Sequence, residues 1–150
     1  GQINAASPLK TNCPLIWALG NCMKSELDIH PYIEWYLENL QYKDNLLTLT
    51  IEESERMSGA LNEPKRYLVV FTDTVLFQKY DETDHFENCS KNREDGIIGK
   101  YSSSILLDYL KRDTLLFDIE PGNLEHYSII TSNECFHVIT REAPKVINVT

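Results

Sequence analysis

The sequence predicts an all-β fold, either an antiparallel barrel or a sandwich, from three observations. Short segments rich in Val, Ile, Phe, Tyr and Thr recur along the chain, and some alternate apolar with polar residues as half-buried strands do. Turn-forming residues separate most of these segments. No helical pattern of crossover length lies between them, which argues against parallel βαβ units. The 150 residues suffice for one domain with its own core.

The clearest strand is predicted at residues 46–52, where Leu47, Leu49 and Ile51 alternate with threonines. The other expected strands are residues 66–71, 74–80, 97–101, 104–110, 115–119, 125–131 and 135–141. The last two are joined by Ser132-Asn133-Glu134, so we expect them to form a hairpin.

The segment before residue 42 carries two competing patterns. Asp28 can cap a helix in which Ile33, Tyr36, Leu37 and Leu40 share one face. Ile33, Trp35 and Leu37 also alternate, as they would in a strand. We expect a short N-terminal helical segment. The expected organisation is a single domain over 1–150, with the arm and helical segment at 1–41, barrel strands at 42–141 and a tail at 142–150.

The net charge of −9 disfavours nucleic acid as a partner, because an acidic surface repels phosphates. Cationic small molecules or basic protein surfaces are the favoured partners, unless the charge serves only solubility. No apolar run approaches the ~20 residues of a membrane helix, so we expect no membrane insertion.

Four cysteines and two sequons point to the secretory pathway. The cysteines, Cys13, Cys22, Cys89 and Cys135, fit no zinc-binding spacing and are even in number, which favours two disulfides. Asn88 and Asn148 begin the sequons and are the expected glycosylation sites. We therefore expect a secreted, extracellular protein in its mature form, with any leader removed. Joining both N-terminal cysteines to downstream ones would close long loops and anchor the N-terminal segment; which pairs with which stays open.

The chain lacks the motifs of common enzymes: it has no G-x-S-x-G, H-E-x-x-H or glycine-rich phosphate loop. We expect no enzymatic activity, no cofactor and no metal. His126 and His137 lie on either side of the last hairpin and can face each other, but no third metal ligand stands out. We interpret them as hydrogen-bonded histidines.

Aromatic residues on the expected strands suit the wall of a small-molecule cavity, which is mostly apolar with a few orienting hydroxyls. An ordinary aromatic core is the competing interpretation. The candidate ligand-binding residues are Trp35, Tyr67, Phe71, Phe77, Tyr101, Phe117 and Tyr127.

The C-terminal hairpin resembles the last two barrel strands of lipocalins, in the calycin superfamily. The similarity rests on residues 125–130 and on the strand that ends in Thr140-Arg141, with Pro144 just after it. The chain resembles divergent salivary lipocalins of ticks and blood-feeding insects. The resemblance implies an eight-stranded up-and-down barrel, an Arg141 side chain stacked on Trp35 or Trp17, and the disulfides Cys13–Cys89 and Cys22–Cys135.

The resemblance also implies a secreted protein that carries or sequesters a small hydrophobic or amphipathic ligand. A lipid, eicosanoid, steroid or biogenic amine would then lie in the barrel cavity. The alternative is a secreted effector module with a filled core that binds a host protein.

Overall fold

The computed structural model describes residues 25–59, 62–80, 91–113 and 123–150. Within them the fold is mostly β, as the sequence predicts. The strands are β1 (Trp35–Lys43), β2 (Leu46–Glu53), β3 (Arg66–Phe71), β4 (Thr74–Tyr80), β5 (Ile98–Lys100), β6 (Glu125–Ile130), β7 (Cys135–Thr140) and β8 (Lys145–Asn148). The helical elements are the 3-10 turns η1 (Glu26–Ile29) and η2 (Tyr32–Glu34) and the helices α2 (Glu55–Ser58) and α3 (Ile105–Asp113). No helix of the described part is long and apolar enough to cross a membrane.

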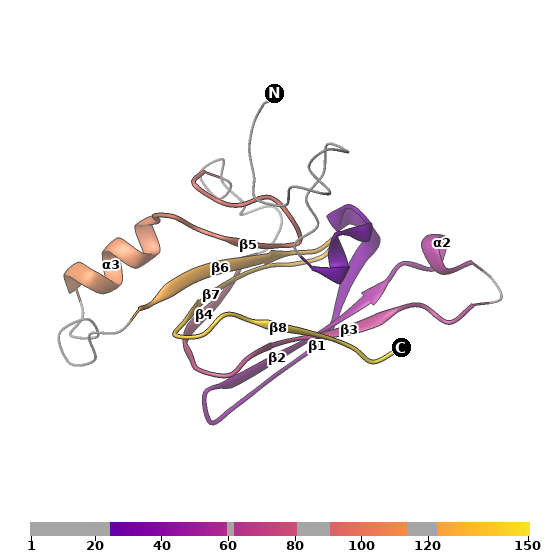
Figure 1. Cartoon of the computed structure of the whole chain (residues 1–150), viewed down its shortest axis with the longest axis horizontal. Helices are drawn as coiled ribbons and strands as arrows, with labels where there is room; N and C mark the ends of the chain where they lie inside the picture. Colours follow the sequence, from indigo (N-terminus) through magenta and orange to yellow (C-terminus); the bar gives the residue numbers. More distant parts are fainter. Residues whose placement is uncertain (1–24, 60–61, 81–90, 114–122) are drawn as a thin grey trace.

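The strands form two four-stranded antiparallel sheets and, within the described residues, do not close into the expected up-and-down barrel. The first sheet has the order β1-β2-β3-β8 and the second the order β4-β7-β6-β5 (Figure 1). In an up-and-down barrel β3 would pair with β4, whereas here β3 pairs with β8 and β4 pairs with β7.

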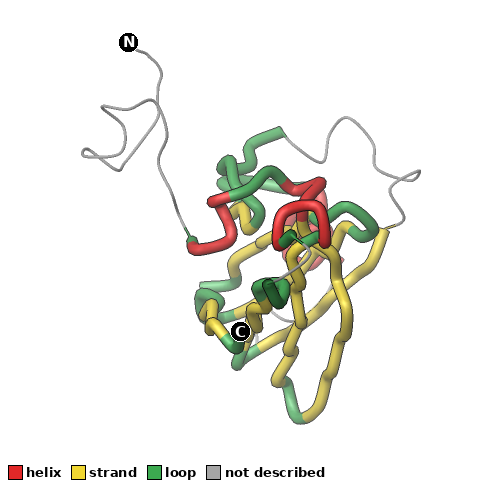
Figure 2. Tube along the Cα trace, turned by 90° about the vertical axis from the view of Figure 1, so that its right-hand side faces the viewer, coloured by secondary structure: helices red, strands yellow, loops and turns green. Residues whose placement is uncertain are grey.

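This strand order follows from two bends at which the chain passes from one sheet to the other. Only Thr72 and Asp73 separate β3 from β4, and residues 141–144 separate β7 from β8. The bends meet, because the Arg141 amide donates to the Asp73 carbonyl at 3.0 Å and the Arg141 side chain lies 3.1 Å from the Asp73 carboxylate. Strands that change sheets at such corners are typical of sandwiches with crossed sheets. Figure 2 shows the strands turning between the sheets.

The core lies between the sheets and is built by strand alternation. In β2 every second side chain, Leu47, Leu49 and Ile51, is fully buried, while Thr48 and Thr50 are half-buried on the outer face. Trp35 is also fully buried, and its indole N–H donates to the Leu27 carbonyl at 2.8 Å. The rest of the cluster comes from β3, the second sheet and the start of the described chain: Leu27, Tyr67, Val69, Phe71, Ile97, Tyr127, Ile129 and Val138.

The N-terminal prediction is partly wrong. Two 3-10 turns do precede the sheet, but the helix does not extend to Leu40, because β1 takes residues 35–43 and pairs with β2. Asp44 and Asn45, both with positive φ, make the tight turn that this hairpin needs. The pairing of β1 with β2 therefore favours strand alternation over helical spacing in this segment. At the other end of the chain, β8 occupies part of the expected tail.

The strand expected at residues 104–110 is wrong, because this segment is helix α3. Ser104 accepts a hydrogen bond from the Leu107 amide at 3.1 Å and so caps the helix. Leu106, Leu107 and Leu110 have the spacing of one helix face, a pattern visible in the sequence. The strand expected at 115–119 lies outside the described residues.

The corner between the sheets generates a stability prediction. The buried Thr140 hydroxyl lies 3.1 Å from the Asp73 carbonyl and 2.9 Å from the Glu142 carbonyl, and it accepts from the Glu142 amide. Thr140→Val should reduce the free energy of unfolding by about 1–2 kcal/mol, because the Glu142 amide and carbonyl lose a hydrogen-bond partner and the Asp73 carbonyl loses one of its two donors. Urea denaturation measures this. Thr48→Val, on the outer face of β2, is the matched control and should change stability by less than about 0.5 kcal/mol; equal losses would contradict the assigned role.

Candidate functional site

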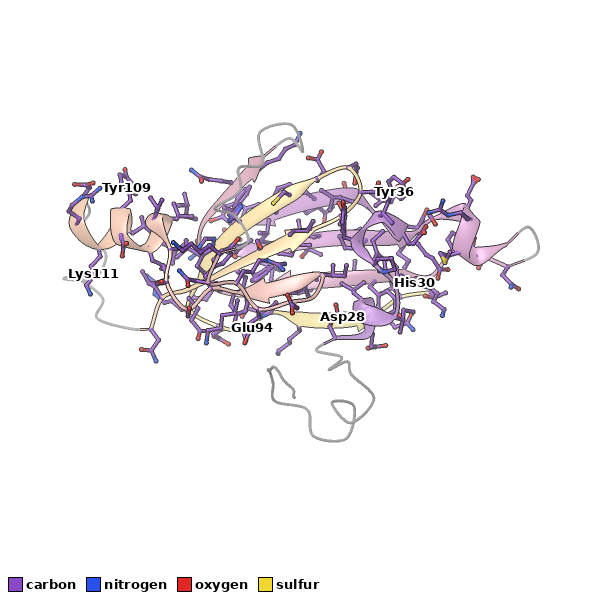
Figure 3. The ribbon with its side chains drawn as sticks, turned by 90° about the horizontal axis from the view of Figure 1, so that it is seen from above. Asp28, His30, Tyr36, Glu94, Tyr109 and Lys111 are labelled. Carbon is purple, nitrogen blue, oxygen red and sulfur yellow. The ribbon has the colours of Figure 1, made fainter. Side chains whose placement is uncertain are left out.

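An open groove of about 640 Å³ lies at one end of the first sheet. We call it the acidic groove. Figure 3 shows His30 and Tyr36 at this end of the molecule, with α3 and its Tyr109 and Lys111 at the opposite end. The groove is lined by Ile33, Glu34, Tyr36, Glu38, Glu52, Glu53, Ser54, Glu55, Arg56 and Ser132.

Antiparallel pairing brings the two halves of the groove together. Tyr36 at the start of β1 is in register with Glu52 at the end of β2, and Trp35 with Glu53. Because successive residues point to opposite faces, Tyr36 and Glu52 project outward while Trp35 enters the core. The Ser54 amide donates to the Glu34 carbonyl at 2.8 Å and so holds the start of α2 against η2.

Two of the groove carboxylates are buried and fixed by specific partners. Glu34 accepts from the Ser54 hydroxyl at 2.7 Å and pairs with Arg56. The Ser54 hydroxyl and the Arg56 guanidinium lower the pKa of Glu34, so its carboxylate stays charged in mild acid. Glu53 lies 2.6 Å from the His30 ring and accepts from the Lys65 amide at 3.2 Å. These contacts shape a rigid acidic wall.

The remaining carboxylates leave the groove negative. Glu52 pairs with Arg66, whereas Glu38 and Glu55 form no ion pair with any described residue. Five carboxylates therefore face the groove with a single lining guanidinium, that of Arg56. Beside them the side chains of Tyr36 and Ile33 are 38% and 49% exposed. Carboxylates next to an exposed aromatic ring suit an ammonium group, through ion pairing and cation–π attraction.

A second polar group, the buried polar cluster, lies within and beside the second sheet: Arg93, Tyr101, Ser104, His126, Ser128, Cys135 and His137. His126 and His137 do face each other, as the hairpin predicts, with Nε2 of His126 2.8 Å from Nδ1 of His137. The other ring nitrogens lie 2.8 Å from the Ser104 hydroxyl and 3.7 Å from the Cys135 sulfur. Neutral histidines can connect the serine to the sulfur in one continuous chain of hydrogen bonds.

Arg93 completes the cluster from the segment before β5. Its guanidinium donates to the Ser128 hydroxyl and to the carbonyls of Glu94, Ile97 and Ser128. Burial lowers the pKa of Arg93, but an arginine remains charged at any ordinary pH. The cluster therefore contains a cation whose hydrogen-bond acceptors are neutral.

The serine–histidine contact is a poor catalytic pair. Burial, followed by the neighbouring His137 and Arg93, lowers the pKa of His126 to about 3. An efficient general base has a pKa near the working pH, and His126 is too weakly basic to activate Ser104 at neutral pH. The arrangement instead ties segments together. Within the described residues no group of three or more His, Cys, Asp or Glu side chains is placed to hold a metal ion.

The structure brings most of the predicted ligand-binding residues together, but they pack against one another in the hydrophobic core and do not line a cavity. Trp35 packs edge-on against Tyr67 and Phe71 packs against Tyr127, with ring centroids 5.7 and 6.0 Å apart. Phe77 packs against this core and against Tyr42. The other two do not join them: Tyr101 stacks on His126 in the buried polar cluster, and Phe117 lies outside the described residues.

The predicted modification sites are placed only in part. Cys13, Cys22, Cys89 and Asn88 lie outside the described residues, and Cys135 is buried in β7. Asn148 is exposed in β8, and its side-chain oxygen accepts from the Thr150 amide at 2.9 Å. The disulfides and both glycans stay predictions.

The expected stacking of Arg141 on Trp35 is wrong. Arg141 is bonded to Asp73, and the neighbouring Thr74 amide donates to Asn45 in the β1–β2 turn. Trp35 lies at the opposite end of that hairpin, beside Glu53. With a strand rise of about 3.3 Å per residue the two are roughly 20 Å apart, beyond the reach of an arginine. The alternative partner, Trp17, lies outside the described residues.

Sequence reasoning missed the groove carboxylates. They come from residues 34–38 and 52–55, and they meet only because β1 and β2 form a hairpin. The signal that could have found them is the pair Asp44-Asn45 between two alternating segments, which predicts that hairpin.

Comparisons with protein-family models, curated proteins and solved structures find no match to this chain.

The packing of Arg93 generates the next prediction. A methyl group on Gly99 would lie 2.4 Å from both the Arg93 guanidinium carbon and the Glu94 carbonyl oxygen. Gly99→Ala should therefore displace Arg93 and reduce the free energy of unfolding by more than about 2 kcal/mol. Thermal and urea denaturation check this. Lys100→Ala, the next residue of β5, removes only a partly exposed ion pair with Glu125 and should cost less than about 1 kcal/mol. A Gly99→Ala protein as stable as Lys100→Ala would refute the packing argument.

Proposed function

We propose that this is a binding protein whose ligand is a small organic cation, an amine held in the acidic groove. One observation carries the proposal: five carboxylates face an open groove of about 640 Å³, and the pairs of Glu34 with Arg56 and of Glu52 with Arg66 neutralise only two of them. This volume lies within the range of small-molecule sites. The net charge of −9 adds a long-range attraction for cations.

The groove favours an aromatic or alkyl amine over a bare inorganic cation. Glu38 and Glu55 offer carboxylates that no described cation occupies, while Tyr36 and Ile33 offer apolar surface next to them. An ammonium group would lie among the carboxylates and its organic part against the Tyr36 ring. Among the ligands considered from the sequence, this chemistry selects the biogenic amine over the lipid, eicosanoid and steroid.

The proposal keeps the ligand-binding role expected from the sequence, but it places the ligand in the acidic groove and not in a cavity between the strands. A ligand enclosed between the sheets would have to displace Trp35, Phe71 or their neighbours, which are fully buried against one another. The lipocalin relationship and secretion remain part of the proposal. The C-terminal hairpin, with β6 and β7 where the resemblance expects them, supports the relationship.

A basic protein surface is the second candidate ligand for the same groove. Ile29, Tyr32 and Met57 belong to the elements that frame the groove and are 42–52% exposed, which adds apolar area beyond what a small amine covers. Exposed aromatic, aliphatic and methionine side chains beside charges are typical of protein interfaces.

Calorimetric titration with three matched indoles tests the amine proposal. Tryptamine is a cation, tryptophol is neutral and indole-3-acetate is an anion, so charge varies while the ring stays the same. We expect binding of tryptamine alone. The double variant Glu38→Gln/Glu55→Gln should weaken it roughly fivefold, which corresponds to about 1 kcal/mol for two surface carboxylates.

Glu142→Gln, at an exposed position in the bend before β8, is the matched control and should leave the affinity unchanged. Raising the salt from 10 mM to 1 M should weaken binding, because the Debye length falls from about 30 to 3 Å. Equal affinity for the three indoles would contradict the proposal. Binding of a lysine-rich peptide without any binding of tryptamine would favour the protein partner.

A further inference from the structure

Residues 91–113 contain β5, the edge strand of the second sheet beside β6, and α3; we call them the cover segment. β5 is a strand of only three residues at the edge of this sheet, and it pairs with β6 alone. Such a short strand contributes little pairing of its own. The attachment of the cover segment therefore depends on contacts beyond the strand pairing.

Several of those contacts converge on His126, while Arg93 donates to Ser128 and the Ile97 amide donates to the Asp28 carboxylate at 2.8 Å. The Tyr101 ring stacks on the His126 imidazole with centroids 4.0 Å apart and an interplanar angle of 14°. The Tyr101 amide donates to the His126 carbonyl at 2.8 Å. The Ser104 hydroxyl, which also caps α3, lies 2.8 Å from Nδ1 of His126. One histidine thus contacts both Tyr101, the residue after β5, and Ser104, the cap of α3.

The surroundings of His126 are unfavourable for a positive charge. Its side chain is almost fully buried, and its two ring nitrogens contact Ser104 and His137, so no described carboxylate is hydrogen-bonded to it. The titratable groups that face it are His137 on β7, Tyr101 after β5 and the Arg93 guanidinium before β5. Cys135 lies beyond His137 in the same chain of hydrogen bonds. A proton added here would place a second buried cation close to Arg93.

We propose that the cover segment is released by acid, with the His126–His137 pair as the trigger. While the imidazoles are neutral, the pair holds Tyr101 and Ser104 against the sheet. When the cover segment lifts, His126 reaches water and can take up a proton. Acid therefore favours the lifted form, and the remaining strands of both sheets stay folded.

The direction of the effect follows from linkage. Burial holds the pKa of His126 at about 3 in the closed form, whereas an exposed histidine has a pKa near 6.5. The closed form loses its advantage as the pH falls from about 6.5 towards 3. Within this window each pH unit should raise the opening equilibrium constant about tenfold, so the change from pH 6.5 to pH 4.5 is roughly 100-fold.

Amide hydrogen exchange on the full chain tests the proposal. The reporting amides are those of Tyr101, bonded to His126, and Ile130, bonded to Ile97; the reference amides are those of Glu53 and Thr74. After correction for the intrinsic pH dependence of exchange, protection of Tyr101 and Ile130 should fall roughly 100-fold between pH 6.5 and pH 4.5. Protection of Glu53 and Thr74 should fall far less. No change at Tyr101, or an equal loss at all four amides, would overturn the proposal.

Variants identify the responsible histidine. His126→Gln cannot take up a proton and should remove most of the pH dependence at Tyr101. His30→Gln, at the other end of the molecule against Glu53, is the matched control and should retain it. If His126→Gln does not fold, an NMR titration of the wild-type imidazoles decides. A His126 that titrates near 6.5 while Tyr101 stays protected would refute the mechanism.

Discussion

The contact between the two bends, in which Asp73 meets Thr140 and Arg141, is the constraint on which the rest of the structure depends. At this corner two stretches of chain pass from one sheet to the other: β3 continues into β4, and β7 continues into β8. Each sheet contributes one face to the same core, with Leu49 and Phe71 from the first and Tyr127 and Val138 from the second. The corner fixes the sheets at one end, and hydrogen bonds from Ser132 and Asn133 to the start of β1 join them at the other.

Much of the strand content was predictable, because the alternation of Leu47, Leu49 and Ile51 reflects one buried face. Pairing was not predictable from local pattern. Tyr36 and Leu40 have helical spacing, yet the β1–β2 hairpin places them on opposite sides of a bulge in an edge strand. α3 was missed although Leu106, Leu107 and Leu110 have helical spacing and Ser104 supplies a helix cap.

The candidate site likewise could be predicted only where it depends on local sequence and not on strand pairing. The histidine pair was predictable, because a tight hairpin brings two known positions together. The acidic groove was not, because its carboxylates come from two stretches of chain that only tertiary pairing makes neighbours. Aromatic composition indicated large apolar walls, but it could not tell a cavity from the packed contacts that Trp35 and Tyr67 make.

The acidic groove and the buried polar cluster differ in the charge that their side chains carry. At the groove, hydroxyl, guanidinium, imidazole and amide partners hold the buried carboxylates of Glu34 and Glu53 in place. At the buried polar cluster, His126 is held neutral beside Arg93. The first arrangement suits a cationic ligand and the second fastens a peripheral segment. Figure 3 shows Tyr36 of the groove at one end of the molecule and α3, which Ser104 of the cluster caps, at the other.

Amide chemical-shift mapping with tryptamine tests the central claim most directly, because it reports where a ligand binds whatever its affinity. A ligand in the acidic groove should shift the amides of residues 33–38, 52–56 and 132, and leave those of Phe71, Tyr127 and Val138 in place. Shifts concentrated at Phe71, Tyr127 and Val138 would place the ligand between the sheets and contradict the account.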